Sequence, residues 1–103
     1  MIYLKKYSTD NGVILAMCDA DLIDKVLTEG DLEINIKDYS GFYKGEIIDP
    51  KKVKGIISAE TIHSVNVIGK EAVNAAIESA IIEKGHVKRI NDVPYAQAFS
   101  VKY

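Results

Sequence analysis

Side chains in the first eighteen residues follow the period of two that a β-strand requires. Alternate positions from Ile2 onward share one face of residues 2–8, and alternate positions from Val13 onward share one face of residues 12–18. Between these segments lies Asp10-Asn11-Gly12, where Asn and Gly tolerate the positive φ of a tight turn. The pattern predicts an N-terminal hairpin.

The next segment changes to helical spacing. Its aliphatic residues fall on one face of a helix: Leu22, Ile23, Val26 and Leu27. Asp19 precedes them as a residue that can cap a helix N-terminus, and Gly30 follows as a residue common just past a helix end. We therefore predict a helix of about two turns here.

Residues 32–45 combine a strand pattern with a turn-rich one. Leu32, Ile34 and Ile36 alternate with polar residues, which predicts a third strand with one solvated face. Residues 39–45 are rich in aromatic residues and glycine. This composition indicates a loop, or a short strand with a bend.

A capping signal opens a short helix at Asp49. Pro50 follows at the first helical position, where a missing N–H is tolerated. The apolar residues Val53, Ile56 and Ile57 continue on one face.

The clearest helix follows a β-branched strand. Residues 62–68 predict the strand, and Gly69 marks where it bends into the helix. The helix stripe consists of Ala72, Val73, Ala76, Ile77, Ala80 and Ile81. Gly85 lies near the expected helix end.

Two strand patterns close the chain, at residues 87–90 and 95–101, with Asn91-Asp92-Val93-Pro94 as the turn between them. Residues 1–103 fit one domain, because one core is usual at this length. We predict an α+β fold, with a mostly antiparallel sheet, N- and C-terminal hairpins and about three helices packed on it.

Composition narrows the class of protein. A hydrophobic share of 48% and a charged share of 27% are ordinary for a globular domain. Residues 1–7 contain neither the apolar core of a signal peptide nor a membrane span. Cys18 is the single cysteine, so no internal disulfide forms. We expect a cytoplasmic protein.

Net charge argues against indiscriminate binding to nucleic acid. The formal charge is −2, whereas phosphate-binding domains usually carry a large basic excess. Arg89 is the lone arginine. Any contact with nucleic acid is therefore expected to be local.

Candidate catalytic or metal-binding residues do not form a recognised motif. His63, Ser64 and Asn66, like the pair His86 and Cys18, have no spacing typical of a nucleophile and its base. The carboxylates at 19, 21 and 24 are explained by helix capping. We expect no catalytic residue, no metal and no cofactor, and an enzyme is the less favoured interpretation.

Two surfaces are candidates for binding. The helix that starts at Gly69 offers free N–H groups to an anion, although a plain strand-to-helix turn is the favoured interpretation. On the last strand, alternation places Tyr95, Gln97, Phe99, Val101 and Tyr103 on one face, beside Lys88 and Arg89 of the paired strand. Such a face can stack bases. The favoured alternative places Phe99 and Val101 in the core, with Tyr95 at its edge.

With these segments in view, the chain resembles the small archaeal family known as domain of unknown function 424 along nearly its whole length. The resemblance rests on Ala16-Met17-Cys18-Asp19 after the hairpin, on Tyr43-Lys44-Gly45-Glu46, on the run from Asn66 to Val73 and on the run from Ile90 to Gln97. Histidine is usual after the proline in that family, and Tyr95 stands here. A stacking or hydrogen-bonding role therefore suits this position better than proton transfer.

The resemblance implies a setting among archaeal translation genes and no known activity. The candidate binding residues are Asn66, Gly69, Lys70, Lys88, Arg89, Pro94, Tyr95 and Gln97. The first hypothesis is a small non-catalytic protein of archaeal information processing that contacts RNA or a ribonucleoprotein. The second is a small-molecule or anion-binding protein, or an enzyme, that uses the helix N-terminus at Gly69. The third is a protein-interaction or homodimer module with exposed strand edges.

Overall fold

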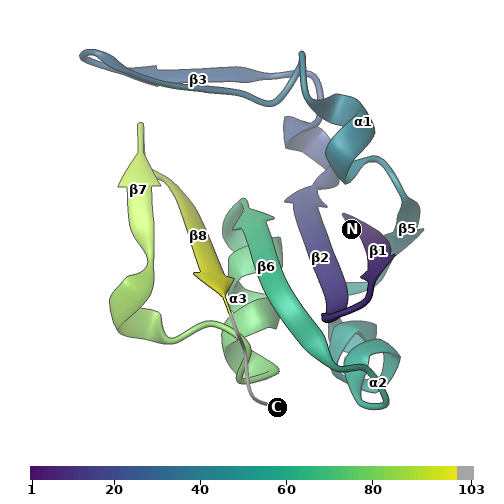
Figure 1. The fold of residues 1–103 in the computed structure, drawn as a ribbon. Coiled ribbons are helices and arrows are strands. Elements are labelled where there is room, and N and C mark those ends of the chain that lie inside the picture. The colour runs from purple at the N-terminus through teal and green to yellow at the C-terminus, as the bar shows by residue number, and fades with distance from the viewer. Residues whose placement is uncertain (100–103) are drawn as a thin grey trace.

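The computed structural model describes residues 1–99, which form a six-stranded sheet and a separate two-stranded hairpin (Figure 1). Across the large sheet the strands are, in order, β5 (Glu46–Ile48), β1 (Ile2–Thr9), β2 (Gly12–Asp19), β6 (Ile62–Ile68), β8 (Val93–Phe99) and β7 (Lys88–Ile90). The α-helices of these residues are α1 (Ser40–Tyr43), α2 (Val53–Ile57) and α3 (Lys70–Glu78). This arrangement confirms the α+β prediction.

Strand pairing is antiparallel except between β2 and β6, which run parallel. The N-terminal hairpin is confirmed, with Ile2 opposite Asp19 and Thr9 opposite Gly12. The C-terminal hairpin is also confirmed, but its turn is shorter than expected. Asn91 and Asp92 make the turn with positive φ, and Pro94 already belongs to β8.

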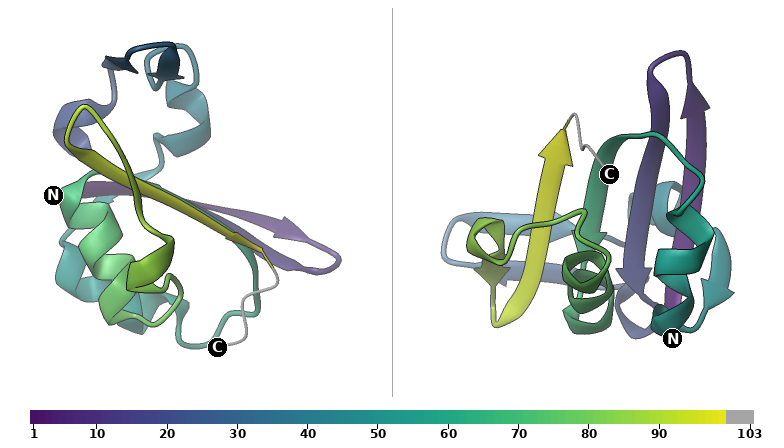
Figure 2. Two further views of the ribbon diagram at one scale, coloured as in Figure 1. Left: turned by 90° about the vertical axis from the view of Figure 1, so that its left-hand side faces the viewer. Right: turned by 90° about the horizontal axis from the view of Figure 1, so that it is seen from below.

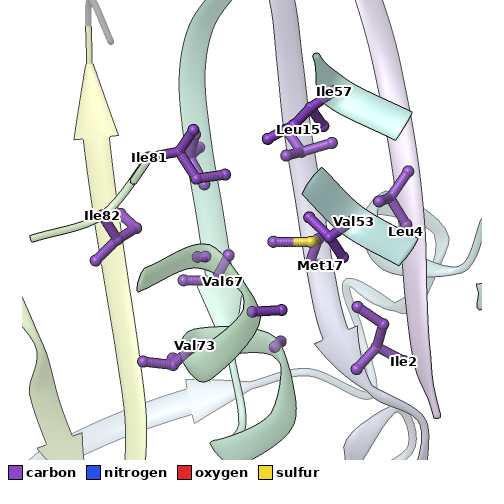
Figure 3. Packing of buried hydrophobic residues seen from close by; sticks show 14 of the residues in the cluster. Ile2, Leu4, Leu15, Met17, Val53, Ile57, Val67, Val73, Ile81 and Ile82 are labelled. Carbon is purple, nitrogen blue, oxygen red and sulfur yellow. The ribbon is translucent and has the colours of Figure 1, made fainter. Parts of the chain in front are cut away.

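One face of the sheet is covered by α2 and α3, and this interface is the main hydrophobic core (Figure 2, left). Leu15 and Met17 from β2 meet Val53 and Ile57 from α2, and all four side chains are fully or almost fully buried (Figure 3). The alanines of α3 are buried as well, because small side chains let a helix lie close to a sheet. The side chains that alternate with these along each strand point to the opposite face of the sheet.

The helix predicted between Asp19 and Gly30 is wrong. A 3-10 turn at Ala20–Leu22 leads instead into β3 (Val26–Glu29), which pairs with β4 (Leu32–Asn35) around Gly30. The strand predicted over 32–37 is therefore present but shorter. Leu27 is buried while Val26 is exposed. The aliphatic residues from which the helix was predicted therefore belong partly to a strand with one buried face.

Two further boundaries differ from the predictions. The segment 39–45 contains the short helix α1 where a loop or bent strand was expected. Helix α3 ends at Glu78, although its apolar stripe continues. Ala80 has a positive φ of 60°, and the turn that it makes buries Ile81 and Ile82 in the main core.

The short helix at Asp49 is confirmed in two parts. The Asp49 carboxylate accepts a hydrogen bond from the Lys51 N–H at 2.9 Å and caps a 3-10 turn at Pro50–Lys52. Helix α2 follows directly and buries Val53 and Ile57.

A second, smaller hydrophobic cluster lies on the other face of the sheet, at the end where β2 and β6 finish. It joins Cys18 and Ile68 of the sheet to Ile23, Leu27 and Ile36 of the segment that carries the β3–β4 hairpin. Figure 2 (left) shows this hairpin and α1 above one end of the sheet, on the side opposite α2 and α3. Within residues 1–99, no helix or strand covers the rest of that face.

Candidate functional site

The pairing of β6 with β8 creates the polar centre of the partly covered face, which we call the open face. Asn66 lies directly opposite Gln97, and the next pairs on the same face are Ser64 with Phe99 and Ile68 with Tyr95. The Gln97 side-chain amide donates a hydrogen bond to Oδ1 of Asn66. Two residues that are 31 positions apart in the sequence thus form one amide pair.

A cavity of about 250 Å³ lies beside this amide pair. Its lining includes Asn66 and Gln97, the ring of Tyr95 from β8, and Ile34 and Tyr43, which reach over from β4 and α1. The site therefore combines an amide pair, two phenol rings and aliphatic carbon. Sequence reasoning missed Ile34 and Tyr43 as site residues. The resemblance motif Tyr43-Lys44-Gly45-Glu46 was the available signal for Tyr43.

Aromatic residues extend the open face toward β1. The Tyr7 ring stacks on Phe42 of α1, with centroids 5.3 Å apart and planes at 12°. The Tyr7 hydroxyl donates to the Phe42 carbonyl at 2.8 Å, and Lys5 Nζ donates to the Gly41 carbonyl at 2.8 Å. These bonds fix α1 on the sheet. A neighbouring cavity of about 350 Å³ is lined by Tyr39, Phe42 and Tyr43 among others.

The expectation that Phe99 belongs to the core is wrong, since its side chain is 70% exposed. The alternation itself holds through residue 99. Ala96 and Ala98 of β8 belong to the main core, so Gln97 and Phe99 point to the open face. Tyr95 packs at the edge of the smaller cluster, as the alternative interpretation placed it. Val101 and Tyr103 lie outside the described residues.

The candidate basic residues do not gather on one surface. Lys88 pairs with Tyr95 and so lies on the open face. Arg89 pairs with Pro94, and both line a different hollow that they share with Lys70 on the helix side of the sheet. The structure therefore brings Asn66, Tyr95 and Gln97 together around one cavity and places Lys88 opposite Tyr95 on the same face. Lys70, Arg89 and Pro94 line a separate hollow.

Gly69 is buried and has a structural role at the start of α3. Its φ is +107°, and a Cβ at this position would overlap the Asp19 carboxylate. That carboxylate accepts hydrogen bonds from the N–H groups of Ala72 at 2.8 Å and Glu71 at 3.2 Å. Asp19 therefore caps α3, and not the helix predicted directly after it. A side chain of the protein already occupies the helix N-terminus that was a candidate anion site.

Burial changes the acidity of the groups around this cap. Burial raises the pKa of Asp19 above its ordinary value, although the two N–H bonds oppose that shift. Burial, reinforced by the nearby carboxylates of Asp19 and Asp21, raises the pKa of the Cys18 thiol to about 12. Burial likewise raises the pKa of the Tyr43 hydroxyl. Cys18 is thus a protonated, buried thiol at neutral pH, which does not suit a nucleophile.

The remaining polar candidates stay apart. Ser64 is buried within β6, and the exposed His86 lies 3.9 Å from Glu83 in a solvated pair. Among residues 1–99, no group of three or more His, Cys, Asp and Glu side chains is placed to hold a metal ion. No helix in the same part of the chain is both long and apolar enough to cross a membrane.

The fold and this site define a small α+β protein whose sheet is covered by helices on one face and partly open on the other. The chain belongs to the family described as Protein of unknown function (DUF424), whose model matches residues 7–101. It is also similar to the crystal structure of an uncharacterized conserved protein from Methanopyrus kandleri, at 22% sequence identity and a TM-score of 0.77. That match covers 99% of this chain and 93% of the other. No curated protein matches the sequence.

Proposed function

We propose that this protein is a small non-catalytic binding protein that contacts single-stranded RNA through the open face of its sheet. The observation that carries the proposal is the Asn66–Gln97 amide pair, which lies between the partly buried Tyr95 and the exposed Phe99 on β8. The sequence resemblance suggests archaeal information processing as its setting. Two properties of the open face support this function, stacking surface and hydrogen-bonding capacity, and its modest charge indicates which part of RNA it contacts.

Stacking surface comes from Tyr95 and Phe99, which flank the amide pair along β8. Phe99 is 70% exposed, and an isolated exposed ring on a strand gains little from packing. Aromatic rings on an open sheet are the surfaces on which single-stranded nucleic acids stack their bases. Each base–ring stack contributes about 1–3 kcal/mol to affinity, as judged by alanine substitution.

The amide pair supplies hydrogen-bonding groups that its internal bond leaves available. A carboxamide carries two N–H donors and a carbonyl acceptor. After Gln97 donates one N–H to Asn66, the two side chains keep further donors and the Gln97 carbonyl. Adjacent donors and acceptors match base edges, as when Asn or Gln pairs with adenine. The pair therefore suits unpaired bases whose edges are free.

Charge on the open face is modest, which agrees with the net charge of −2. Among residues 1–99, Lys5 and Lys88 are the cations that the register of the large sheet places on this face. Most of the affinity for RNA should then come from bases. This distinguishes the proposed contact from nonspecific binding to phosphates, which depends on a basic surface.

Fluorescence anisotropy with labelled single-stranded RNA tests the proposal. The full chain should bind single strands of mixed sequence more tightly than a duplex of equal length, because bases in a duplex are already stacked. Phe99→Ala should weaken binding by about 1–3 kcal/mol. Asn74→Ala is the matched control, because Asn74 is an exposed residue of α3 on the other side of the sheet. Equal affinities for single strands and duplex, or equal losses in both variants, would exclude binding through the open face.

A further inference from the structure

A further hollow lies on the helix side of the molecule, away from the open face, and we call it the α3 groove. Its volume is about 300 Å³. Val73 and Ile77 from α3, Val87 from the segment before β7 and Pro94 from β8 form its apolar lining. Aliphatic carbon is thus contributed by three separate parts of the fold.

Cations line the same groove. Lys70 lies at the start of α3, Lys84 in the 3-10 turn Lys84–His86 and Arg89 on β7. Within residues 1–99, none of the three forms an ion pair. Arg89 makes a single long contact, from Nη1 to the Asp92 carbonyl at 3.4 Å. Positive charge around this groove is therefore available to a partner.

Within residues 1–99, no carboxylate lines the groove. Of the acids next in sequence to lining residues, Glu71 lies 3.0 Å from the Met1 amino group and Glu83 lies 3.9 Å from His86. Glu78 accepts a hydrogen bond from the lining residue Asn74 at 3.3 Å. The chain has 15 acidic and 13 basic residues, yet the described lining of this groove consists of cations, one amide and aliphatic carbon. Such a lining is complementary to one kind of partner surface. The complement is a surface that carries both carboxylates and aliphatic side chains.

We propose that the α3 groove binds an acidic, amphipathic peptide segment of a protein partner. Aliphatic side chains of the segment cover Val73, Ile77 and Val87, and flanking Asp or Glu residues pair with Lys84 and Arg89. The absence of aromatic rings from the described lining favours a peptide over RNA, because unpaired bases need a ring on which to stack. The groove and the open face lie on opposite sides of β8, so both can be occupied together.

Three fluorescein-labelled probe peptides of twelve residues test the proposal with the full chain. One places leucines on one face of a helix and glutamates at the other positions, one replaces glutamate by lysine, and one is polyglutamate. The Leu/Glu peptide should bind saturably and at least about tenfold more tightly than either other peptide, because it alone complements both charge and aliphatic carbon. In spectra of the ¹⁵N-labelled chain, the largest changes should fall at Asn74, Ile77 and Val87.

Charge reversal separates the groove from general electrostatics. K84E with R89E should reduce affinity for the Leu/Glu peptide by at least about tenfold, since two charge-assisted contacts become repulsive. K25E with K37E is the matched control, because it gives the same net charge with exposed lysines of the β3–β4 segment. Both variants are first compared by circular dichroism and thermal unfolding to confirm equal folding.

Several results would overturn the proposal: no saturable binding of the Leu/Glu peptide, equal binding of polyglutamate, or an equal loss in K25E with K37E. If single-stranded RNA displaced the peptide and shifted the NMR resonances of the groove, the cations would be shown to bind phosphate. That result would also overturn the proposal of a peptide partner. The peptide results do not depend on RNA binding at Phe99. If the peptide proposal fails, the proposed RNA binding by the open face is still tested separately.

Discussion

The two faces of the large sheet are built from the same strands but differ in burial. On the helix face, aliphatic side chains of β2 and β6 are buried against α2 and α3. On the open face, the β3–β4 hairpin and α1 cover only one end, and the side chains beyond it include Gln97 and the exposed Phe99. Burial stabilises the first face, whereas the second presents groups that a ligand can contact. Substitutions should therefore affect stability on one face and binding on the other.

The largest effect is expected from truncation on the helix face. Leu15 is fully buried between the sheet and α2, so Leu15→Ala should destabilise the protein by about 2–5 kcal/mol through lost burial and the cavity that remains. Phe99→Ala on the open face should change the free energy of unfolding by no more than about 0.5 kcal/mol. Urea denaturation followed by circular dichroism measures both. Similar losses in the two variants would contradict the division between faces.

The cap that Asp19 provides for α3 should give the next largest effect. Gly69→Ala should cost about 1–3 kcal/mol, because it forces a side chain into a positive-φ position against the Asp19 carboxylate. Asp19→Ala should cost about 1–2 kcal/mol, because two N–H groups of α3 lose their acceptor.

The double variant provides a control for this interpretation. Removing the carboxylate makes room for the alanine Cβ, so Asp19→Ala with Gly69→Ala should cost less than the sum of the single losses. Measuring the free energy of unfolding of the wild type, both single variants and the double variant completes this double-mutant cycle. Strict additivity would show that the Gly69 backbone, and not its contact with Asp19, sets the cost.

A smaller effect should appear as a dependence of stability on pH. Because burial raises the pKa of Asp19 in the folded state, the folded protein holds this proton more tightly than the unfolded chain does. The stabilisation that the protonated Asp19 gives the folded state is fully present below about pH 3.9, the ordinary Asp value. It is lost as the pH rises through the raised pKa. Carboxyl ¹³C shifts in NMR titrations report that pKa directly.

Asp19→Asn isolates this contribution, because asparagine keeps a hydrogen-bond acceptor and does not titrate. The stability advantage of the wild type over the variant should shrink as the pH rises across this window. A pKa for Asp19 below the ordinary value would show that the bonds from Glu71 and Ala72 outweigh burial.

The smallest effect expected is the response of RNA binding to salt. Single strands lose affinity with a logarithmic slope of about −0.7 per neutralised phosphate. With Lys5 and Lys88 as the cations of the open face, the slope should be about −1.4. Lys88→Ala should reduce the magnitude of this slope by about half, and Lys54→Ala, an exposed position of α2 on the helix side, should leave it unchanged. A slope several times steeper would indicate binding by a basic surface.

Local sequence patterns predicted the segments in which periodicity and turn residues agree. Both hairpins and the helix after Gly69 belong to this group. The pattern misled at residues 22–30, because the spacing of Ile23 and Leu27 suits a helix face equally well. In the structure the two residues are buried from a turn and a strand. Gly30 makes the hairpin turn there with a φ of 59°.

The candidate site was only partly predictable, because its geometry depends on contacts between distant segments. Asn66 and Gln97 were candidates separately, but their pairing depends on the register of β6 with β8. Tyr43 joins them only because α1 is anchored on β1. The cap of α3 by Asp19 spans more than fifty positions. No local periodicity carries such information.

The most direct test of the account is an NMR titration of the ¹⁵N- and ¹³C-labelled chain with an unstructured single-stranded hexaribonucleotide. If the open face binds bases, the largest shift changes will fall on the Asn66 and Gln97 side-chain amides and on the rings of Tyr95 and Phe99. Val73 and Ile77 in the α3 groove will remain unchanged. Absence of saturable changes, or changes confined to the α3 groove, would contradict it.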